Sequence, residues 1–506
     1  MKILIAGAGP VGLCCAHLLG HAGIESVLIE KQVKLGTHPS AHYIHSRSME
    51  ILRDIGISQQ IYENMPNKEN WRKFIYCKNI LGEVYRSHDH FSTAAYQLNN
   101  KLSDMHTAHF PQHKLLSLLA NSLPETASLS LGKEFSELSQ GASGVKVKTA
   151  DGEEFEGDYL IACDGASSKV RNFLGIRLEG TGILQHFLNI HFISKELGSL
   201  AKNNPAMIYF VYNPENVCVM VMHNADEGEF IMQYPFYPEH QHLSNFTDAD
   251  YKEIISSVAG SSINDVEIKS IKPWRLASRL ANEFSKDRVF LAGDSAHQMT
   301  PAGGFGLNSG IKDAHCLCWR FQYPELLKFY SQERHQFLEE ILKTSLGYYY
   351  KAVNIAKNFR LDLDNMKIFQ DFTSYLPFGN EWIFNQGMKW GQKAMFNDAN
   401  ARYYLSDDKN LIDNVHPKED LELAYTSGYF ENGGELAPNV EILYENKKIP
   451  LRALPAVLMK KNKKPVFIKL EGKNPLPTIP YETFTMPSHS STSYLIRPDG
   501  HLYSSK

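Results

Sequence analysis

The chain has 506 residues, which is more than a single hydrophobic core usually serves, so we expect two or three domains. Its apolar share of 43% is typical of a soluble globular protein. A formal net charge of -4 excludes a global positive field that would gather nucleic acid or an anionic membrane, so small-molecule chemistry is favoured.

No run of about 18 consecutive apolar residues occurs, and we expect no membrane-spanning helix. The chain opens directly on the apolar run 3–6, which leaves no room for a secretion signal. Seven scattered cysteines without a Cys-x-x-Cys pair indicate neither a disulfide framework nor a zinc site. We therefore expect a soluble, cytoplasmic protein.

Residues 2–30 predict a strand, a glycine turn, a helix and a second strand that ends at Glu30. The turn reads Gly7-Ala8-Gly9-Pro10-Val11-Gly12. Glycines in this context permit a tight turn and let backbone amides approach a pyrophosphate, and an acid at the position of Glu30 can accept hydrogen bonds from a ribose. The pattern predicts a dinucleotide site for NAD or FAD.

The segment 106–113 carries His106, His109 and His113 at roughly helical spacing, which would suit a metal ion. Pro111 interrupts such a helix, so the three imidazoles would not share a face. We expect no metal site.

A second apolar strand, 158–163, ends in Asp164-Gly165, and Ser168 and Arg171 follow where a helix should begin. Arg171 could meet a phosphate or could be an ordinary helix-surface arginine. Farther along, residues 207–212 and 217–222 are rich in β-branched and aromatic residues, which predicts a mainly antiparallel sheet.

Residues 288–314 predict a buried strand, the polar residue Asp294, a Pro-Ala-Gly-Gly loop and a helix. A loop with so little side-chain bulk suits the close approach of backbone to a flat ligand. His297 lies within this motif and could brace the loop or act in catalysis. A helical pattern follows from about residue 325 to residue 396, then a polar connector at 406–420 and short strands to the end.

These motifs resemble the FAD-dependent aromatic hydroxylases of the para-hydroxybenzoate hydroxylase and phenol hydroxylase type, the group A flavoprotein monooxygenases. The glycine turn, the Asp-Gly motif and the Gly-Asp motif occur in the order typical of that family. Residues 46–52 resemble the family's arginine-bearing helix and residues 110–116 its glutamine-bearing helix. Residues 494–503 resemble the closing segment of the thioredoxin-like tail of the phenol hydroxylase branch, and residues 433–438 the beginning of that tail.

The resemblance implies an α/β fold with a Rossmann-like FAD-binding domain in two pieces, residues 1–181 and 275–350. A mainly antiparallel β-sheet substrate domain is inserted at residues 182–274. A helical region and connector at 351–420 and a thioredoxin-like C-terminal module without cysteines at 421–506 complete the expected order.

The resemblance also implies that FAD is the dinucleotide and that Gly7, Gly9 and Gly12 face its pyrophosphate and Glu30 its ribose. Arg47 and Gln112 would contact the phosphate and ribityl region, and Asp294 the ribityl chain. The isoalloxazine would lie along Pro301, Gly304, Gly306, Leu307 and Asn308. Asp164 and Arg171 are implied both in FAD binding and in the passage of NAD(P)H. No catalytic side chain and no metal ligand is implied.

The implied reaction is a monooxygenation in which NAD(P)H reduces FAD and dioxygen forms a flavin C4a-hydroperoxide. Its distal oxygen would pass to an aromatic or polyketide-like small molecule. Two alternatives stay open: a flavin-dependent reductase of the prenyl-reductase type, and a flavin-holding protein that binds a ligand without turnover. The substrate's identity, the choice of NADH or NADPH and the formation of a homodimer are also open.

Overall fold

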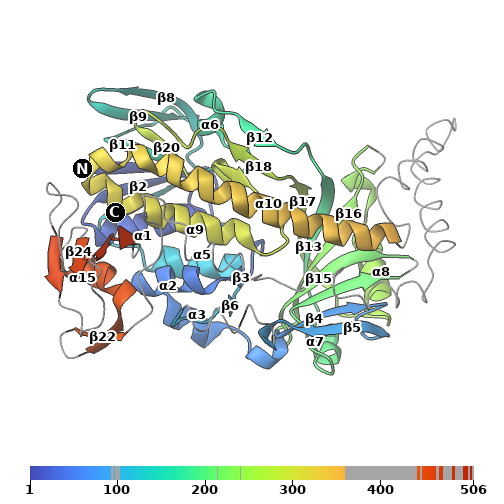
Figure 1. The fold of residues 1–506 in the computed structure, drawn as a ribbon. Coiled ribbons are helices and arrows are strands. Elements are labelled where there is room, and N and C mark those ends of the chain that lie inside the picture. Colours follow the sequence, from blue (N-terminus) through green and yellow to red (C-terminus); the bar gives the residue numbers. More distant parts are fainter. Residues whose placement is uncertain are drawn as a thin grey trace.

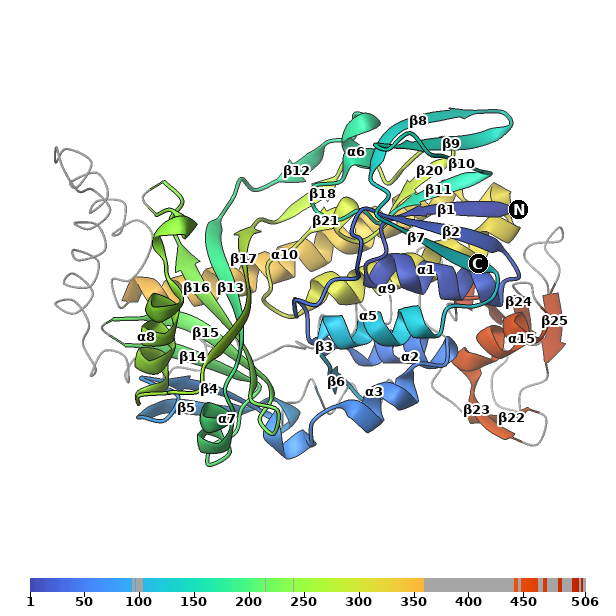
Figure 2. The same ribbon diagram turned by 180° about the vertical axis from the view of Figure 1, so that it is seen from behind.

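The computed structural model describes residues 1–92, 96, 103–213, 215–239 and 241–358, and the C-terminal segments 441–444, 447–462, 467–470, 481–484, 494–499 and 502–503. Three regions are visible in it (Figures 1 and 2): a domain of helices packed on a sheet, a second large sheet at one end and a small C-terminal unit at the other. The expected connector and the start of the expected tail, within residues 359–440, lie outside the described residues.

A six-stranded sheet forms the centre of the first domain, in the order β19-β20-β11-β1-β2-β7. Its strands are β1 (Lys2–Ala6), β2 (Glu25–Glu30), β7 (Ala127–Leu131), β11 (Tyr159–Ala162), β20 (Val289–Leu291) and β19 (Ser285–Lys286). All neighbours are parallel except β19 and β20. A parallel sheet needs helices on its faces, and its strands are accordingly apolar along their length, as in β1, where Ile3, Leu4 and Ile5 are fully buried.

Helix α1 (Pro10–His21) packs against α9 (Phe305–Cys318) and α5 (Gln112–Asn121). This contact joins the glycine turn, the Gly-Asp motif and the glutamine-bearing helix, which are far apart in the sequence. Beside them lie α2 (Ser46–Asp54), α3 (Ser58–Asn64) and the short ladder of β3 (Tyr43–Ile44) with β6 (Ala108–His109). The predicted motifs therefore gather at one edge of the parallel sheet.

The second region is a seven-stranded sheet in the order β17-β13-β16-β15-β14-β4-β5. Its strands are β4 (Lys73–Cys77), β5 (Val84–Asp89), β13 (Gln185–Ile193), β14 (Ile208–Tyr212), β15 (Val217–Asn224), β16 (Glu229–Phe236) and β17 (Glu267–Leu276). Neighbouring strands are antiparallel except β14 and β4, which are parallel. Two strands thus come from residues 73–89, outside the 182–274 interval expected for this sheet.

One face of this sheet packs on α8 (Asp248–Ala259) through alternate residues such as Leu188, Met220 and Met232. Helix α8 begins with a capping box between Thr247 and Asp250 and ends at Gly260, whose φ of 82° glycine tolerates. Because strand side chains alternate, the intervening residues lie on the opposite face, toward β3 and β6.

Smaller elements join the two regions. A three-stranded sheet of β12 (Leu178–Gly180), β18 (Arg279–Ala281) and β21 (His297–Gln298) lies where the chain leaves and re-enters the first domain. The antiparallel strands β8 (Phe135–Gly141), β9 (Gly144–Thr149) and β10 (Glu154–Gly157) and the short helices α6 (Lys169–Phe173) and α7 (Lys195–Ala201) precede α8 in the chain. Helix α10 (Lys328–Asn358) then runs past both regions (Figure 1).

The C-terminal unit contains a two-stranded ladder, β22 (Glu441–Tyr444) and β23 (Lys447–Pro450), and the helix α15 (Leu454–Asn462). A mixed sheet follows in the order β25-β24-β26-β27, made of β24 (Phe467–Leu470), β25 (Tyr481–Phe484), β26 (Tyr494–Ile496) and β27 (Leu502–Tyr503). Both views place this unit beside α1 and α2, away from the seven-stranded sheet (Figures 1 and 2). Its thioredoxin-like character stays a prediction.

Candidate cofactor site

The three glycines of the turn, Gly7, Gly9 and Gly12, differ in the room that the structure leaves for a Cβ atom. Gly7 has a φ of 99°, and a Cβ there would overlap the carbonyl oxygen of Cys163. A Cβ on Gly12 would overlap the carbonyl oxygen of Gly7. Gly9 has an ordinary φ of -70°, and its Cβ would meet nothing within 4 Å. The fold itself therefore requires Gly7 and Gly12, whereas Gly9 borders open space.

That open space lies at the start of α1, whose first amides have no partner within the helix and suit an anion. Glu30, at the end of β2, braces the turn by accepting hydrogen bonds from the amides of Ala8 at 2.8 Å and Gln32 at 2.9 Å. The site expected for a pyrophosphate thus has a rigid backbone and room beside it.

The loop before α9 repeats this arrangement. Gly303 and Gly304 have φ values of 90° and 66°, and Gly304 is the N-cap of α9. At Gly306, the second residue of α9, a Cβ would meet nothing within 4 Å. Pro301 is exposed and Leu307 is half-buried, so this stretch also faces open space.

Asn308, which was expected along the isoalloxazine, has a buried side chain that bonds to the protein backbone. Its side chain is 1% exposed and donates to the carbonyl oxygens of Tyr43 at 2.9 Å and Gly304 at 2.6 Å. Its Oδ1 accepts a hydrogen bond from the amide of His45 at 2.8 Å. These bonds occupy the amide group, so Asn308 fixes the glycine loop against β3.

Asp294 follows β20 and has an exposed side chain. The surrounding protein nevertheless raises the pKa of its carboxyl group, with nearby His297 opposing and Asp313 adding to the effect. The exposure and the raised pKa fit together if protein atoms surround the carboxyl group closely and leave one side of it open to solvent. Such a group is available to the hydroxyl groups of a bound ligand.

Behind Asp294 lies a buried ionic group centred on Asp313 of α9. Its Oδ1 accepts from Arg334 at 2.6 Å, and its Oδ2 lies 2.7 Å from His297 Nε2 and 2.9 Å from the Gly293 amide. Burial alone would raise the pKa of Asp313, but Arg334 and His297 outweigh it and hold that pKa below its usual value. His297 therefore braces the Gly-Asp motif.

Asp164 and Arg171 lie on the other side of the glycine turn. Asp164 Oδ2 accepts from the amide of Val170 at 3.1 Å, while Oδ1 is buried and has no hydrogen-bond partner among the described residues. Burial raises the pKa of this carboxyl group. An orphaned acceptor here fits a ligand that brings a donor.

Arg171 is 5% exposed, and burial lowers its pKa. Its guanidinium donates to the carbonyl oxygens of Ser295 at 3.0 Å and Ala166 at 3.2 Å. Arg171 is therefore a buried residue that ties the Asp-Gly motif to the Gly-Asp motif, and its expected part in FAD binding and NAD(P)H passage stays a prediction.

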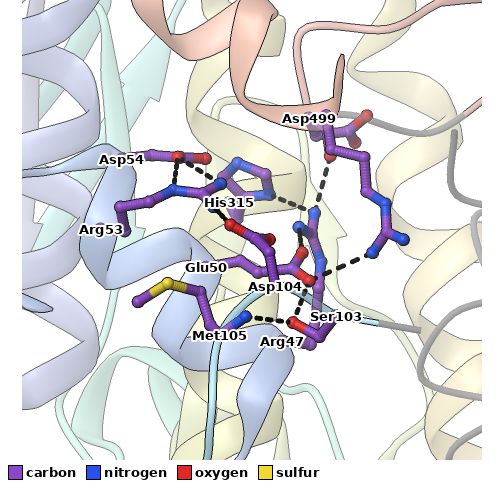
Figure 3. A network of polar contacts seen from close by, with 10 residues as sticks. Arg47, Glu50, Arg53, Asp54, Ser103, Asp104, Met105, His315 and Asp499 are labelled. Carbon is purple, nitrogen blue, oxygen red and sulfur yellow. Dashed lines mark hydrogen bonds and ion pairs between the residues drawn. The ribbon is translucent and has the colours of Figure 1, made fainter. Parts of the chain in front are cut away.

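Arg47 lies in a buried network on α2 (Figure 3). It pairs with Glu50 at 2.6 Å, donates to the carbonyl oxygen of Asp499 at 2.8 Å and approaches His315 Nδ1 at 3.5 Å. Glu50 also accepts from Ser103 at 2.5 Å and Arg452 at 3.1 Å. Burial would raise the pKa of Glu50, but the two arginines bring it below its usual value.

The sequence did not reveal this network. The spacing of Arg47 and Glu50 allows a helix ion pair, but nothing local identifies Arg452 or Asp499 as partners. Gln112, the other residue expected near the phosphate, begins α5 and accepts from the Ala41 amide at 3.2 Å. Contacts of Arg47 and Gln112 with a cofactor remain predictions.

We predict that Asp294→Ala weakens FAD retention more than Asp164→Ala. Asp294 is exposed at the site, and a charge-assisted hydrogen bond to a ligand is typically worth about 1.5–3 kcal/mol, or roughly 10- to 100-fold in Kd. Asp164 instead supports the start of α6, so its loss should act mainly on stability. The flavin dissociation constants of the two variants test this order. A larger loss of affinity in Asp164→Ala would mean that Asp164, and not Asp294, is the main ligand of FAD.

Comparison with known proteins places these observations in context. A family described as "FAD binding domain" matches residues 1–345. Tetracenomycin A2 monooxygenase-dioxygenase of Streptomyces glaucescens is 30% identical over 365 residues, which are 66% of this chain and 65% of that protein. The 2,4-dichlorophenol 6-monooxygenase of Delftia acidovorans is 26% identical over 368 residues, 67% of this chain and 61% of that protein. The chain thus spans less than two thirds of either relative.

Solved structures show the same fold over nearly the whole chain. The flavin-dependent monooxygenase PieE, solved with FAD and substrate, has a TM-score of 0.76 at 20% identity, covering 99% of this chain and 95% of PieE. Aklavinone-11 hydroxylase, solved with FAD and aklavinone, has a TM-score of 0.71 at 19% identity, covering 99% and 94%. Within the residues that the structure describes, no helix is long and apolar enough to cross a membrane.

Proposed function

Because the chain belongs to the FAD binding domain family, we propose that it is an FAD-dependent monooxygenase that consumes NAD(P)H and dioxygen to hydroxylate an aromatic or polyketide-like small molecule. The observation that carries this proposal is the pair of glycines, Gly9 and Gly306, that border open space at the starts of α1 and α9. Among the described residues no atom close to these two positions requires glycine there, whereas a dinucleotide lying across both helix starts would.

The described residues fit FAD. Gly9 and the first amides of α1 would hold the pyrophosphate, Glu30 the ribose, Asp294 the ribityl chain, and the loop 301–307 the isoalloxazine. The orphaned Oδ1 of Asp164 supplies a further acceptor close to the turn. Bound FAD would supply the reaction with dioxygen, which no side chain here can carry out.

The chain's own contribution is to orient the substrate and to exclude water. The face of the seven-stranded sheet turned away from α8 carries stacked aromatic pairs, Phe74 with His90 at 4.8 Å and Tyr76 with Phe210 at 4.7 Å between ring centroids. Phe74 belongs to the same buried aromatic cluster as Tyr43, whose Cβ lies 3.6 Å from the position of a Cβ on Gly304. A flat, apolar substrate would suit a position beside this buried aromatic cluster and the flavin loop.

The test is anaerobic reduction followed by oxygen. NAD(P)H should bleach the bound flavin, oxygen should restore its colour, and a matching phenol or polyketide should accelerate NAD(P)H consumption and gain one oxygen atom from dioxygen. A flavin that NAD(P)H never reduces would point to the non-catalytic alternative. A product that is reduced and contains no new oxygen would point to the prenyl-reductase type.

A separate prediction concerns Arg171. Because its guanidinium binds two backbone carbonyl groups, Arg171→Ala should lower the free energy of unfolding by about 2–4 kcal/mol. The apparent affinity for NAD(P)H, measured by stopped-flow reduction of the flavin that remains bound, should stay within about threefold of wild type. A tenfold or larger loss of that affinity without loss of stability would restore the expected role in NAD(P)H passage.

A further inference from the structure

Three histidines from separate parts of the chain meet where the two large regions touch. His42 immediately precedes β3, His109 is the last residue of β6, and His223 lies in β15. The β3–β6 ladder pairs Tyr43 with His109, which brings His42 and His109 together. One ring nitrogen from each of the three residues lies within 4.8 Å of the others.

The nitrogen positions are close to those of a metal site. His42 Nδ1 and His109 Nδ1 are 3.1 Å apart and share a hydrogen bond, which a metal ion bound to both nitrogens would replace. Zinc binds imidazole nitrogen at about 2.0–2.1 Å, and tetrahedral geometry then separates two ligand nitrogens by roughly 3.3 Å. The nitrogens of His42 and His109 therefore already have the required separation. Rotation of the His223 ring can bring its nitrogen to a similar distance from both.

His109 is held by a contact that suits a metal ligand. Its Nε2 lies 2.9 Å from the carbonyl oxygen of Met222, which can only accept, so Nε2 carries the proton. The lone pair of His109 is then on Nδ1, facing His42. A backbone carbonyl that binds the far nitrogen of an imidazole is the usual way to orient a metal-binding histidine.

His223 provides the independent observation. It is 1% exposed, and neither of its ring nitrogens has a hydrogen-bond partner among the described residues. A buried polar group without a hydrogen-bond partner destabilises the folded protein. A ligand that accepts the lone pair of His223 would remove part of this destabilisation.

We propose that His42, His109 and His223 bind one divalent transition-metal ion, with Zn²⁺ as the best-suited ion. Neutral imidazoles favour such ions, and three protein ligands leave a fourth position for water or another small ligand. The spacing of His106, His109 and His113 in the sequence gave no sign of this set.

A second cluster with suitable ligand atoms, Cys316, Glu333 and Asp499, differs because its charges are already paired. Arg320 and Arg497 form ion pairs with its carboxylates, so cations already satisfy this cluster. The three histidines have no such counter-charge in direct contact among the described residues and form the stronger candidate.

The test uses chelator-treated, FAD-loaded, full-length protein without an affinity tag. Calorimetric titration with Zn²⁺ should give one site per chain with a Kd at or below about 1 µM. His42→Gln and His223→Gln should each weaken this binding by more than about 100-fold, because even groups outside the ligand shell are typically worth 10- to 100-fold. Cu²⁺ bound to the wild-type protein should show coupling to three nitrogens in its EPR spectrum, a result that does not depend on a variant folding.

The matched control is His191→Gln, which removes another buried imidazole from the same sheet, one that pairs with Glu229 at 3.1 Å. It should leave the Zn²⁺ affinity unchanged. Absence of a wild-type site, or equal affinity in well-folded His223→Gln protein, would overturn the proposal. A wild-type protein that binds no metal, combined with an altered pH dependence of flavin reduction in the His42 and His223 variants, would overturn it in favour of a proton-transfer group.

Discussion

Gly9→Leu should give a folded but colourless protein. The φ of Gly9 is -70°, which leucine adopts without strain, and its Cβ would meet no protein atom within 4 Å. The added side chain would instead fill the space expected for the FAD pyrophosphate. Overpacking typically costs about 1–3 kcal/mol, so the FAD Kd should rise by roughly 10- to 100-fold or more. Flavin absorbance of purified protein and circular dichroism measure the two effects.

Two other glycines serve as controls. Gly7→Ala should lose both fold and flavin, because its φ of 99° and its contact with the Cys163 carbonyl leave no room for a Cβ. Gly182→Leu, also at a position where a Cβ meets nothing within 4 Å but far from the fingerprint in sequence, should change neither. Full flavin content in folded Gly9→Leu protein would place the dinucleotide elsewhere.

Asp313→Asn should produce a large loss of stability in a protein that still folds. The carboxylate of Asp313 is fully buried and neutralises Arg334, which is itself buried, so the substitution leaves an uncompensated guanidinium. Breaking a buried ion pair from one side typically costs about 3–5 kcal/mol. Urea unfolding followed by circular dichroism measures the loss. The exposed pair of Lys133 and Asp151 offers a matched control, since Asp151→Asn should cost less than about 1 kcal/mol.

The same carboxylate should give the protein a pH dependence. Because the folded pKa of Asp313 is held below its unfolded value, its contribution is complete above about pH 4, the usual pKa of aspartate, and is lost as pH falls through the lower folded value. Asp313→Asn should reduce the acid sensitivity of unfolding in this range. An unchanged acid transition would mean that another carboxylate dominates it.

Local sequence patterns were sufficient for the first domain. A glycine turn between an apolar strand and a helix has few structural interpretations, so Gly7, Gly12 and Glu30 could be placed before any coordinates. The Gly-Asp motif was similarly informative, because Gly303 and Gly304 have the positive φ values that few other residues tolerate. Family resemblance added the identity of FAD, which spacing alone left open.

Non-local pairing could not be predicted. Strand β4 joins the large sheet by parallel pairing with β14, more than 130 residues later, so Phe74 lies opposite Ile208. The contacts of individual side chains could not be predicted for a related reason. Arg171 has a charge that suits a phosphate, but only the folded backbone reveals that the carbonyl groups of Ser295 and Ala166 occupy it.

Because of the buried network around Glu50, the packing of α2 depends on residues more than 400 positions later in the chain. Arg452 follows Glu50 by 402 residues, and Asp499 follows Arg47 by 452. While the chain emerges from a ribosome, helix α2 is complete long before these partners exist, and its two charges must stay hydrated until synthesis is nearly finished. Contacts of such sequence separation form late and slowly. The N-terminal nucleotide-binding region should therefore reach its final packing only after Arg452 and Asp499 have been synthesised.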